Sequence, residues 1–189
     1  YDTGDDPYCY AGTAVLKNIP GIRDAEALQE FETVCSLQRS DEPLPRGRFS
    51  IRHYCAVHRH LFQDVYRRAG RYRTVRIAKG ASSFCYPENI PREMTRVFGD
   101  LRNHNHLRDL ASEEFAAQSA QFLSELNAIH PFRDGNGRTQ VAFLAALADS
   151  AGHPLVLARL EPDRWLDAMI QSFVGTPSEL TAQIHGRVD

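Results

Sequence analysis

Apolar residues recur every three to four positions along most of the chain, which is the spacing of amphipathic helices. The stripes predict helices at residues 23–38, 50–69, 90–102, 112–129, 137–151, 162–174 and 177–186. The first stripe consists of Ala25, Leu28, Phe31, Val34 and Leu37, and the second of Ile51, Tyr54, Val57, Leu61 and Val65. Gly70 and Gly152 follow two of these stripes and are candidate helix ends. The fold class is therefore expected to be mainly α.

Residues 73–86 have a different pattern. Strand-forming residues flank the sequence Lys-Gly-Ala-Ser-Ser at 79–83, which is typical of a hairpin tip. We expect a β-hairpin that covers one side of a helical bundle. At 189 residues the chain is expected to form one domain. Its expected parts are an N-terminal arm at 1–22, the hairpin at 73–86, two helices with their loop at 112–151 and C-terminal helices at 162–189.

Composition excludes several classes of protein. A net charge of −2 argues against a direct nucleic-acid binder. Arginines at 67, 68, 71, 73 and 76, with Lys79, form a local basic cluster that suits an acidic partner or is only a solvated surface. No apolar run approaches 18 residues and no signal peptide is recognised, so we expect a cytoplasmic protein without a membrane span.

The cysteines and nearby histidines do not form a metal-binding pattern. Four scattered cysteines without a C-x-x-C pair are expected to be reduced thiols. Cys55, His58 and His60 would point to different faces of one helix, so no zinc site is expected there.

The most informative segment is His-Pro-Phe-Arg-Asp-Gly-Asn-Gly-Arg at residues 130–138, between two predicted helices. A helix start binds anions through unpaired N–H groups. Gly135 and Gly137 allow close approach of a phosphate and positive φ angles, and Asn136 adds a side-chain donor. Arg138 suits bidentate binding of phosphate oxygens. These residues together indicate a phosphate site.

Two further side chains of this segment suit catalysis. A carboxylate among anion-binding groups needs a cation between it and the phosphates, so Asp134 is interpreted as a Mg²⁺ ligand. His130 is the candidate proton acceptor, and Phe132 is expected to anchor the loop in the core. The alternative is ordinary turn chemistry, because Asp-Gly-Asn-Gly alone is a common turn sequence.

This segment resembles the signature of the Fic (filamentation induced by cAMP) family, H-x-F-x-[D/E]-G-N-G-R-x-x-R. Every fixed position matches except the last, where Val141 stands in place of arginine. Residues 10–18 resemble the N-terminal entry of bacterial members, and residues 75–80 resemble the family's flap hairpin. The resemblance implies the Fic fold, a helical bundle with a β-hairpin flap over the active site.

The resemblance implies transfer of AMP from ATP, with Mg²⁺ as cofactor, to a Tyr, Thr or Ser hydroxyl of a target protein. In that reaction His130 would be the base, Asp134 the metal ligand, and residues 135–138 the phosphate site. Ile77 and Lys79 of the flap would clamp the modified side chain, with the target bound by strand addition. The alternative for the flap is a short hairpin that only covers the core.

Regulation is also implied by the resemblance. Many members carry an [S/T]-x-x-x-E-[G/N] helix whose glutamate displaces the γ-phosphate. Here Glu88 is the only glutamate before Gly or Asn, and Phe84 stands where Ser or Thr is required. The chain therefore resembles short bacterial toxins that a separate small antitoxin inhibits through such a helix. In such toxins a type II topoisomerase is a possible target.

Two alternatives stay open. In the first, Val141 loosens the hold on the γ-phosphate, and another group is transferred, such as UMP, GMP, phosphate or phosphocholine. The chain could instead be an inactive nucleotide-binding or adaptor protein that uses the flap edge to bind a partner. A Fic domain can also be one module of an effector secreted into a host cell.

Overall fold

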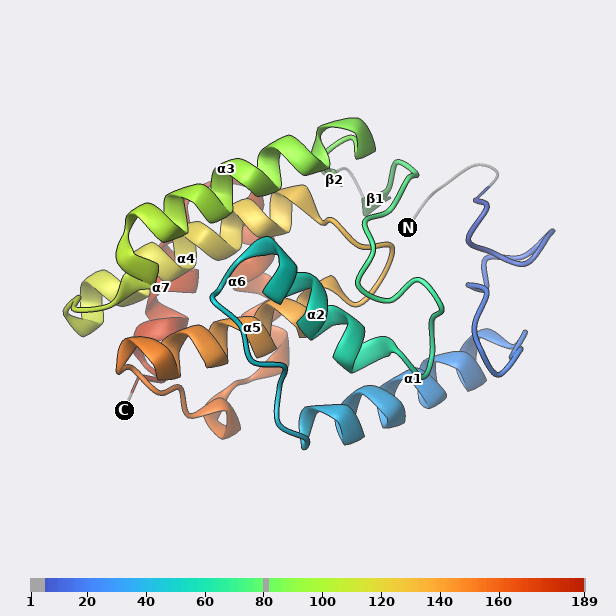
Figure 1. The fold of residues 1–189 in the computed structure, drawn as a ribbon, viewed down its shortest axis with the longest axis horizontal. Helices are drawn as coiled ribbons and strands as arrows, with labels where there is room; N and C mark the ends of the chain where they lie inside the picture. Colours follow the sequence, from blue (N-terminus) through green and yellow to red (C-terminus); the bar gives the residue numbers. More distant parts are fainter. Residues whose placement is uncertain (1–5, 80–81, 189) are drawn as a thin grey trace.

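The computed structural model describes residues 6–79 and 82–188, and this part of the chain contains seven α-helices (Figure 1). The helices are α1 (Ala25–Ser40), α2 (Ile51–Phe62), α3 (Ile90–Asn103), α4 (Ser112–Ile129), α5 (Asn136–Ala151), α6 (Pro162–Val174) and α7 (Ser178–His185). The five predicted helices from residue 90 onward are confirmed to within one residue at each end. Gly152 closes α5 with a φ of 85°, so this predicted helix end is also confirmed.

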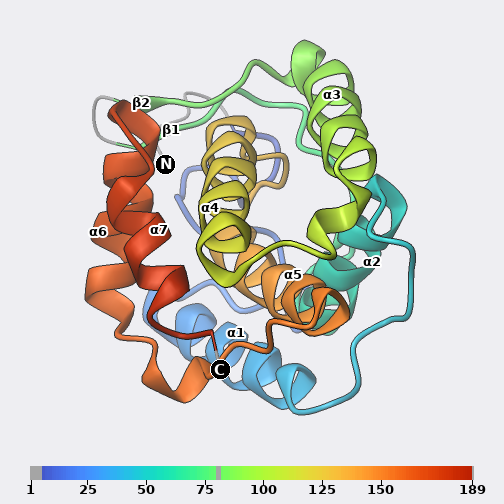
Figure 2. The same cartoon turned by 90° about the vertical axis from the view of Figure 1, so that its left-hand side faces the viewer.

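Helix α4 forms the centre of the bundle, and Figure 2 shows it surrounded by the other helices. It packs against α3, α5, α6 and α7. Its apolar residues lie on more than one face, and Phe115, Ala120, Leu123 and Leu126 are fully buried. A helix that is apolar on several faces belongs in the core of a bundle. The C-terminal end of α4, which leads into residues 130–138, is therefore held firmly.

The inward face of α1 differs from the predicted stripe. Val34 and Leu37 are 53% and 63% exposed, whereas the buried residues are Leu28, Glu32 and Ser36. The predicted stripe is therefore wrong for the second half of this helix. The physical reason is that the inward face meets charged groups of the segment at 130–138, so polar residues are buried there.

Helix α2 ends at Phe62, seven residues before the predicted end at 69. Beyond it the chain turns, and the Gly70 N–H donates to His58 Nδ1 at 2.8 Å. The Val65 carbonyl accepts from the Ile19 N–H of the N-terminal arm at 2.8 Å. These two long-range hydrogen bonds replace helical ones, and Val65 is buried against Val15 instead of continuing a stripe. Local periodicity could not reveal them.

The hairpin is much shorter than predicted. Strands β1 (Ala78–Lys79) and β2 (Ser82–Ser83) pair antiparallel over two residues each. A flap hairpin spanning 73–86 is therefore not confirmed, and the predicted tip at Gly80 and Ala81 lies outside the described residues. Next to the paired strands the Phe84 N–H donates to the Ile77 carbonyl at 3.3 Å. Residues 73 and 74 bind the body of the protein through Arg73 and the Thr74 N–H.

The described residues contain no helix that is long and apolar enough to cross a membrane. All four cysteines are free thiols, as the sequence predicts.

Candidate active site

Residues 130–138 form the loop between α4 and α5 together with the first turn of α5. His130 closes α4 in a left-handed conformation with a φ of 48°, and Gly135 precedes α5 with a φ of 74°. A side chain at Gly135 would also collide with the Phe62 ring, which lies 2.4 Å from the position of a Cβ atom. Glycine at 135 is therefore required by both conformation and space. Gly137 has no positive φ and no neighbour within 4 Å of its Cβ position, so the expectation of positive φ is wrong there.

Asn136 closes the loop from inside. Its Oδ1 accepts from the Phe132 N–H at 3.0 Å, and its Nδ2 donates to the Phe132 carbonyl at 2.9 Å. The side chain is 1% exposed. The expected side-chain donor to phosphate is therefore engaged within the loop, and the backbone N–H of Asn136 remains as its contribution to an anion site. Phe132 is fully buried and stacks on Tyr54.

His58 fixes the backbone of the same loop, a role that the sequence did not reveal. Its Nδ1 accepts from the Gly70 N–H, so its proton is on Nε2, which donates to the Asp134 carbonyl at 2.9 Å. Burial lowers the pKa of His58 to about 4, so the ring is neutral at pH 7. It also packs on Phe132, with the ring centroids 3.8 Å apart. The structural role of His58 is apparent only from its hydrogen bond with Gly70 in the folded chain.

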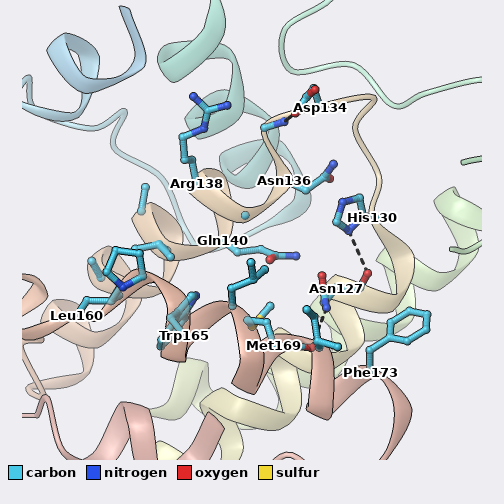
Figure 3. A pocket seen from close by; sticks show the side chains of 18 of the residues that line it. Asn127, His130, Asp134, Asn136, Arg138, Gln140, Leu160, Trp165, Met169 and Phe173 are labelled. Atoms are coloured by element: carbon cyan, nitrogen blue, oxygen red, sulfur yellow. Dashed lines mark hydrogen bonds between the residues drawn. The ribbon is translucent and has the colours of Figure 1, made fainter. Parts of the chain in front are cut away.

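The imidazole of His130 has the orientation of a general base. Its Nδ1 lies 3.2 Å from the Asn127 carbonyl, and the proton must be on Nδ1 for this hydrogen bond (Figure 3). The lone pair is then on Nε2. Burial, together with the positive charges of Arg73 and Lys79, lowers the pKa of His130 to about 4. The ring stacks on Phe84 with centroids 4.0 Å apart, which limits its rotation.

The two buried imidazoles make stability depend on pH. His58 and His130 have pKa values of about 4 in the folded chain against 6.5 ordinarily. Between these values the unfolded chain binds more protons, so the free energy of unfolding falls as the pH is lowered from 6.5 to 4. Urea unfolding at a series of pH values measures this loss. His130→Ala removes one of the two groups and should lose less stability over the same range; an equal loss would contradict this assignment.

The start of α5 provides backbone donors. The first helical hydrogen bond runs from the Thr139 N–H to the Gly135 carbonyl at 3.1 Å. The N–H groups of Asn136, Gly137 and Arg138 precede it, and such groups carry the positive end of the helix dipole. Gly137 leaves this surface uncovered because it has no side chain. The start of α5 is therefore accessible to an anion, which its backbone N–H groups can bind.

Asp134 lies at this helix start. Its Oδ1 accepts from the Gly135 N–H at 2.7 Å. Burial raises the pKa of the Asp134 carboxyl, and the negative charge of Glu32 raises it further. A nearby cation stabilises the charged form of a desolvated carboxylate that lies close to a second carboxylate. Mg²⁺ commonly binds one carboxylate together with substrate phosphates. The oxygen donors present therefore fit Mg²⁺, although the described residues hold no group of three or more metal-binding side chains.

Arg138 is held from the side of α1. Its Nη2 donates to Glu32 Oε1, and its Nη1 donates to Ser36 Oγ at 2.9 Å. The guanidinium lies over the Phe62 ring, 4.7 Å from the centroid. Tyr66 donates its hydroxyl proton to the other oxygen of Glu32. The buried carboxylate of Glu32 on α1 therefore forms an ion pair with Arg138, the arginine that the sequence assigns to phosphate binding.

These groups share a cavity of about 880 Å³ (Figure 3). One end is polar, with Asp134, the start of α5 and Arg138; the other is apolar, with Trp165 and Met169 of α6. The lining residues also include Lys79, Val141 and Gln140. Ile77 does not line the cavity and is only 3% exposed, so the structure brings Lys79 but not Ile77 to the site.

Arg73 connects the hairpin segment to His130, whereas its place in the sequence indicated only a local basic cluster. It is 2% exposed. Its guanidinium donates to four backbone carbonyls: His130 at 2.8 Å, Ile129 at 3.1 Å, Val75 at 2.6 Å and Cys85 at 2.6 Å. Two of these carbonyls belong to the end of α4, where carbonyls lack helical partners. Arg73 therefore holds in place the backbone that carries the His130 imidazole.

Comparison with known proteins agrees with this geometry. Residues 48–148 match the model of the Fic/DOC family. A Sinorhizobium fredii relative, "Probable protein adenylyltransferase y4lH", is 50% identical over 185 residues, covering 97% of this chain and 96% of its own. A Salmonella typhimurium relative, "Probable protein adenylyltransferase Fic", is 35% identical and covers 96% and 92% of the two chains.

The fold is shared with solved structures as well. The N-terminal Fic domain of a VirB-translocated effector from Bartonella quintana, solved with bound ADP, superposes with a TM-score of 0.89 at 27% identity. The alignment covers 96% of this chain and 94% of that one. The chain belongs to the Fic/DOC family.

Proposed function

We propose that this protein is an adenylyltransferase that transfers AMP from ATP to a hydroxyl side chain of another protein. The observation that carries the proposal is that His130, Asp134 and the accessible start of α5 line the same cavity. The relatives named as adenylyltransferases and the ADP-bound neighbour support a nucleotide in this cavity.

The proposed reaction uses the groups at the polar end of the cavity. The target hydroxyl oxygen attacks the α-phosphorus of ATP, and His130 Nε2 takes the hydroxyl proton. The bond from the α-phosphorus to the bridging oxygen breaks, and pyrophosphate leaves. Backbone N–H groups of residues 136–138 stabilise the phosphate oxygens, since fixed donors contribute most where negative charge develops. Mg²⁺, when bound at Asp134, would neutralise charge on the phosphates.

On the target side, Lys79 is the proposed contact of the flap. It is exposed, stands on β1 and lines the cavity that contains His130. An extended target segment could pair with the edge of this short hairpin through backbone hydrogen bonds. Ile77, which the sequence suggested as a second clamp, is buried and would support the hairpin from below.

We further propose that the protein is a bacterial toxin controlled by a small antitoxin, with a type II topoisomerase as one target to examine. A groove of about 740 Å³ runs between α1 and the active-site loop. Residues of α1 between Ala25 and Ser40 line it on one side, and Arg138 lines it on the other. This groove suits an added helix. Because Val141 replaces the family's last arginine, Arg138 is the guanidinium that an inhibitory glutamate would meet there.

Glu32 is expected to oppose ATP binding. Its carboxylate engages Arg138 and adds negative charge beside Asp134. Glu32→Gln removes the charge and keeps the size of the side chain, so the Kd for Mg·ATP should fall on the order of fivefold, which corresponds to about 1 kcal/mol. Quenching of Trp165, the only tryptophan and a lining residue, provides the titration signal. Glu30→Gln, at an exposed residue of the same helix, is the matched control. Weaker ATP binding by Glu32→Gln would contradict the prediction and would show that Glu32 orients Arg138 for the phosphates.

The second candidate function is transfer from another nucleotide donor. Val141 lines the cavity where the family pattern has an arginine, which removes one charge available to the terminal phosphate. Side-by-side transfer assays with ATP, GTP and UTP distinguish the two candidates, because each donor leaves a group of different mass on the target.

Mass spectrometry tests the proposed function. Purified protein is incubated with Mg·ATP and a bacterial lysate, and modified peptides are identified. The proposal predicts AMP on a Tyr, Thr or Ser side chain only when His130 is present. Modification by a different group would favour the second candidate, and no modification with any donor would leave the adaptor alternative.

A further inference from the structure

Gln140 is a buried polar side chain on the wall of the active-site cavity. It stands on α5 four residues after Asn136 and is 1% exposed. Its Nε2 is buried and has no hydrogen-bond partner among the described residues. Figure 3 shows its amide extending from α5 toward the side of Asn127, away from the guanidinium of Arg138. A buried amide without a partner costs free energy, so this donor requires an explanation.

The neighbouring polar groups bind partners other than Gln140. The Asn127 carbonyl accepts from His130, and the Asn127 amide donates to the Met169 carbonyl at 3.1 Å. The Asn136 side chain bonds Phe132 on both of its ends. An acceptor for Gln140 Nε2 can therefore come from whatever fills the cavity, because Gln140 is one of the lining residues.

The position of Gln140 favours one part of a nucleotide. Phosphates belong at the polar end, with the N–H groups of the α5 start and Asp134, and a base belongs against the apolar wall of α6 at Trp165 and Met169. Gln140 lies one turn of α5 beyond the helix start. It carries no charge, and a neutral amide suits a ribose hydroxyl or a ring nitrogen, whereas phosphate oxygens are best bound by cations and helix starts.

We infer that Gln140 is a specificity-determining residue that donates a hydrogen bond to the nucleoside half of the bound nucleotide. The inference rests on the proposed use of ATP in this cavity. A site built to hydrogen-bond its substrate discriminates strongly against ligands that lack the matching acceptor, because its buried donor is then left unpaired.

Calorimetric titration with two ligands tests the inference, namely Mg·ATP and Mg·tripolyphosphate, which has phosphates but no nucleoside. Gln140→Met keeps the approximate volume and removes the donor. The Kd for Mg·ATP should rise roughly tenfold, while the Kd for tripolyphosphate stays unchanged. Equal weakening for both ligands, or no change for ATP, would overturn the inference. Deoxy-ATP analogues and GTP then tell whether the ribose or the base is the acceptor.

Two controls separate this role from folding and from catalysis. Ser119→Ala removes another fully buried hydroxyl that has no hydrogen-bond partner in the described part of the chain. Ser119 lies on α4 and does not line the cavity, so this change should leave ATP binding unchanged. Gln140→Asn keeps an amide on a shorter stem and provides a second variant if Gln140→Met folds poorly. Binding is measured without transfer, so a wild-type protein that binds ATP but modifies no target would refute the proposed function and leave this inference standing.

Discussion

Replacing His130 by alanine is expected to lower the rate of AMP transfer by about 10² to 10⁴, the usual contribution of a general base. ATP binding should change little, because the phosphate groups are met by the α5 start and Arg138 and not by the imidazole. The neutral ring, with Nδ1 bonded to the Asn127 carbonyl, can accept a proton at Nε2 throughout the neutral pH range. The measurement is kcat for transfer together with the Kd from Trp165 fluorescence.

The backbone at His130 calls for a second variant. The residue is left-handed with a φ of 48°, and asparagine tolerates that conformation better than alanine. His130→Asn should therefore lose transfer to the same degree while keeping the loop intact. His104→Ala, at an exposed histidine after α3, is the matched control with normal activity. Retention of transfer within a factor of ten of wild type by both His130 variants would refute the role of general base.

Replacing Arg73 by methionine is expected to give the largest loss of stability of any change considered. Four backbone carbonyls would lose their donor at a buried position, at about 1–3 kcal/mol for each group left unsatisfied. Partial relaxation reduces the sum, and we expect the free energy of unfolding to fall by roughly 3–5 kcal/mol. Urea unfolding measures this loss.

Arg71 provides the comparison for Arg73. It is exposed and lies two residues earlier in the same basic cluster, so Arg71→Met should change stability very little. Arg73→Lys should recover part of the stability, because one ammonium group can reach some of the carbonyls. A loss of stability below about 1 kcal/mol in Arg73→Met would show that the guanidinium does not support the end of α4.

The sequence predicted those elements that are specified by residues close together along the chain. The helices at 112–129 and 137–151 have regular apolar stripes, and the loop between them has turn residues, so both the elements and the segment at 130–138 could be located. The same residues carried the resemblance to the Fic family. The location of a site formed by a short run of neighbouring residues was therefore accessible from the sequence.

The missed features depend on contacts between distant segments. Glu32 and Arg73 reach the site from positions 106 and 57 residues away from their partners, Arg138 and His130. The α1 stripe and the end of α2 were wrong because buried charges and the Gly70–His58 hydrogen bond override the apolar periodicity. Such contacts leave no signal in spacing, although a charged residue such as Glu32 interrupting an apolar face is a sign of a buried polar partner.

The most direct test of AMP transfer uses ATP labelled at either the α- or the γ-phosphate, incubated with the protein, Mg²⁺ and a cell lysate after any copurifying inhibitor has been removed. His130→Ala runs alongside. The account predicts a labelled protein band from α-labelled ATP alone, and only with His130 present. Label from the γ-phosphate, or no label from either ATP, would contradict AMP transfer from ATP.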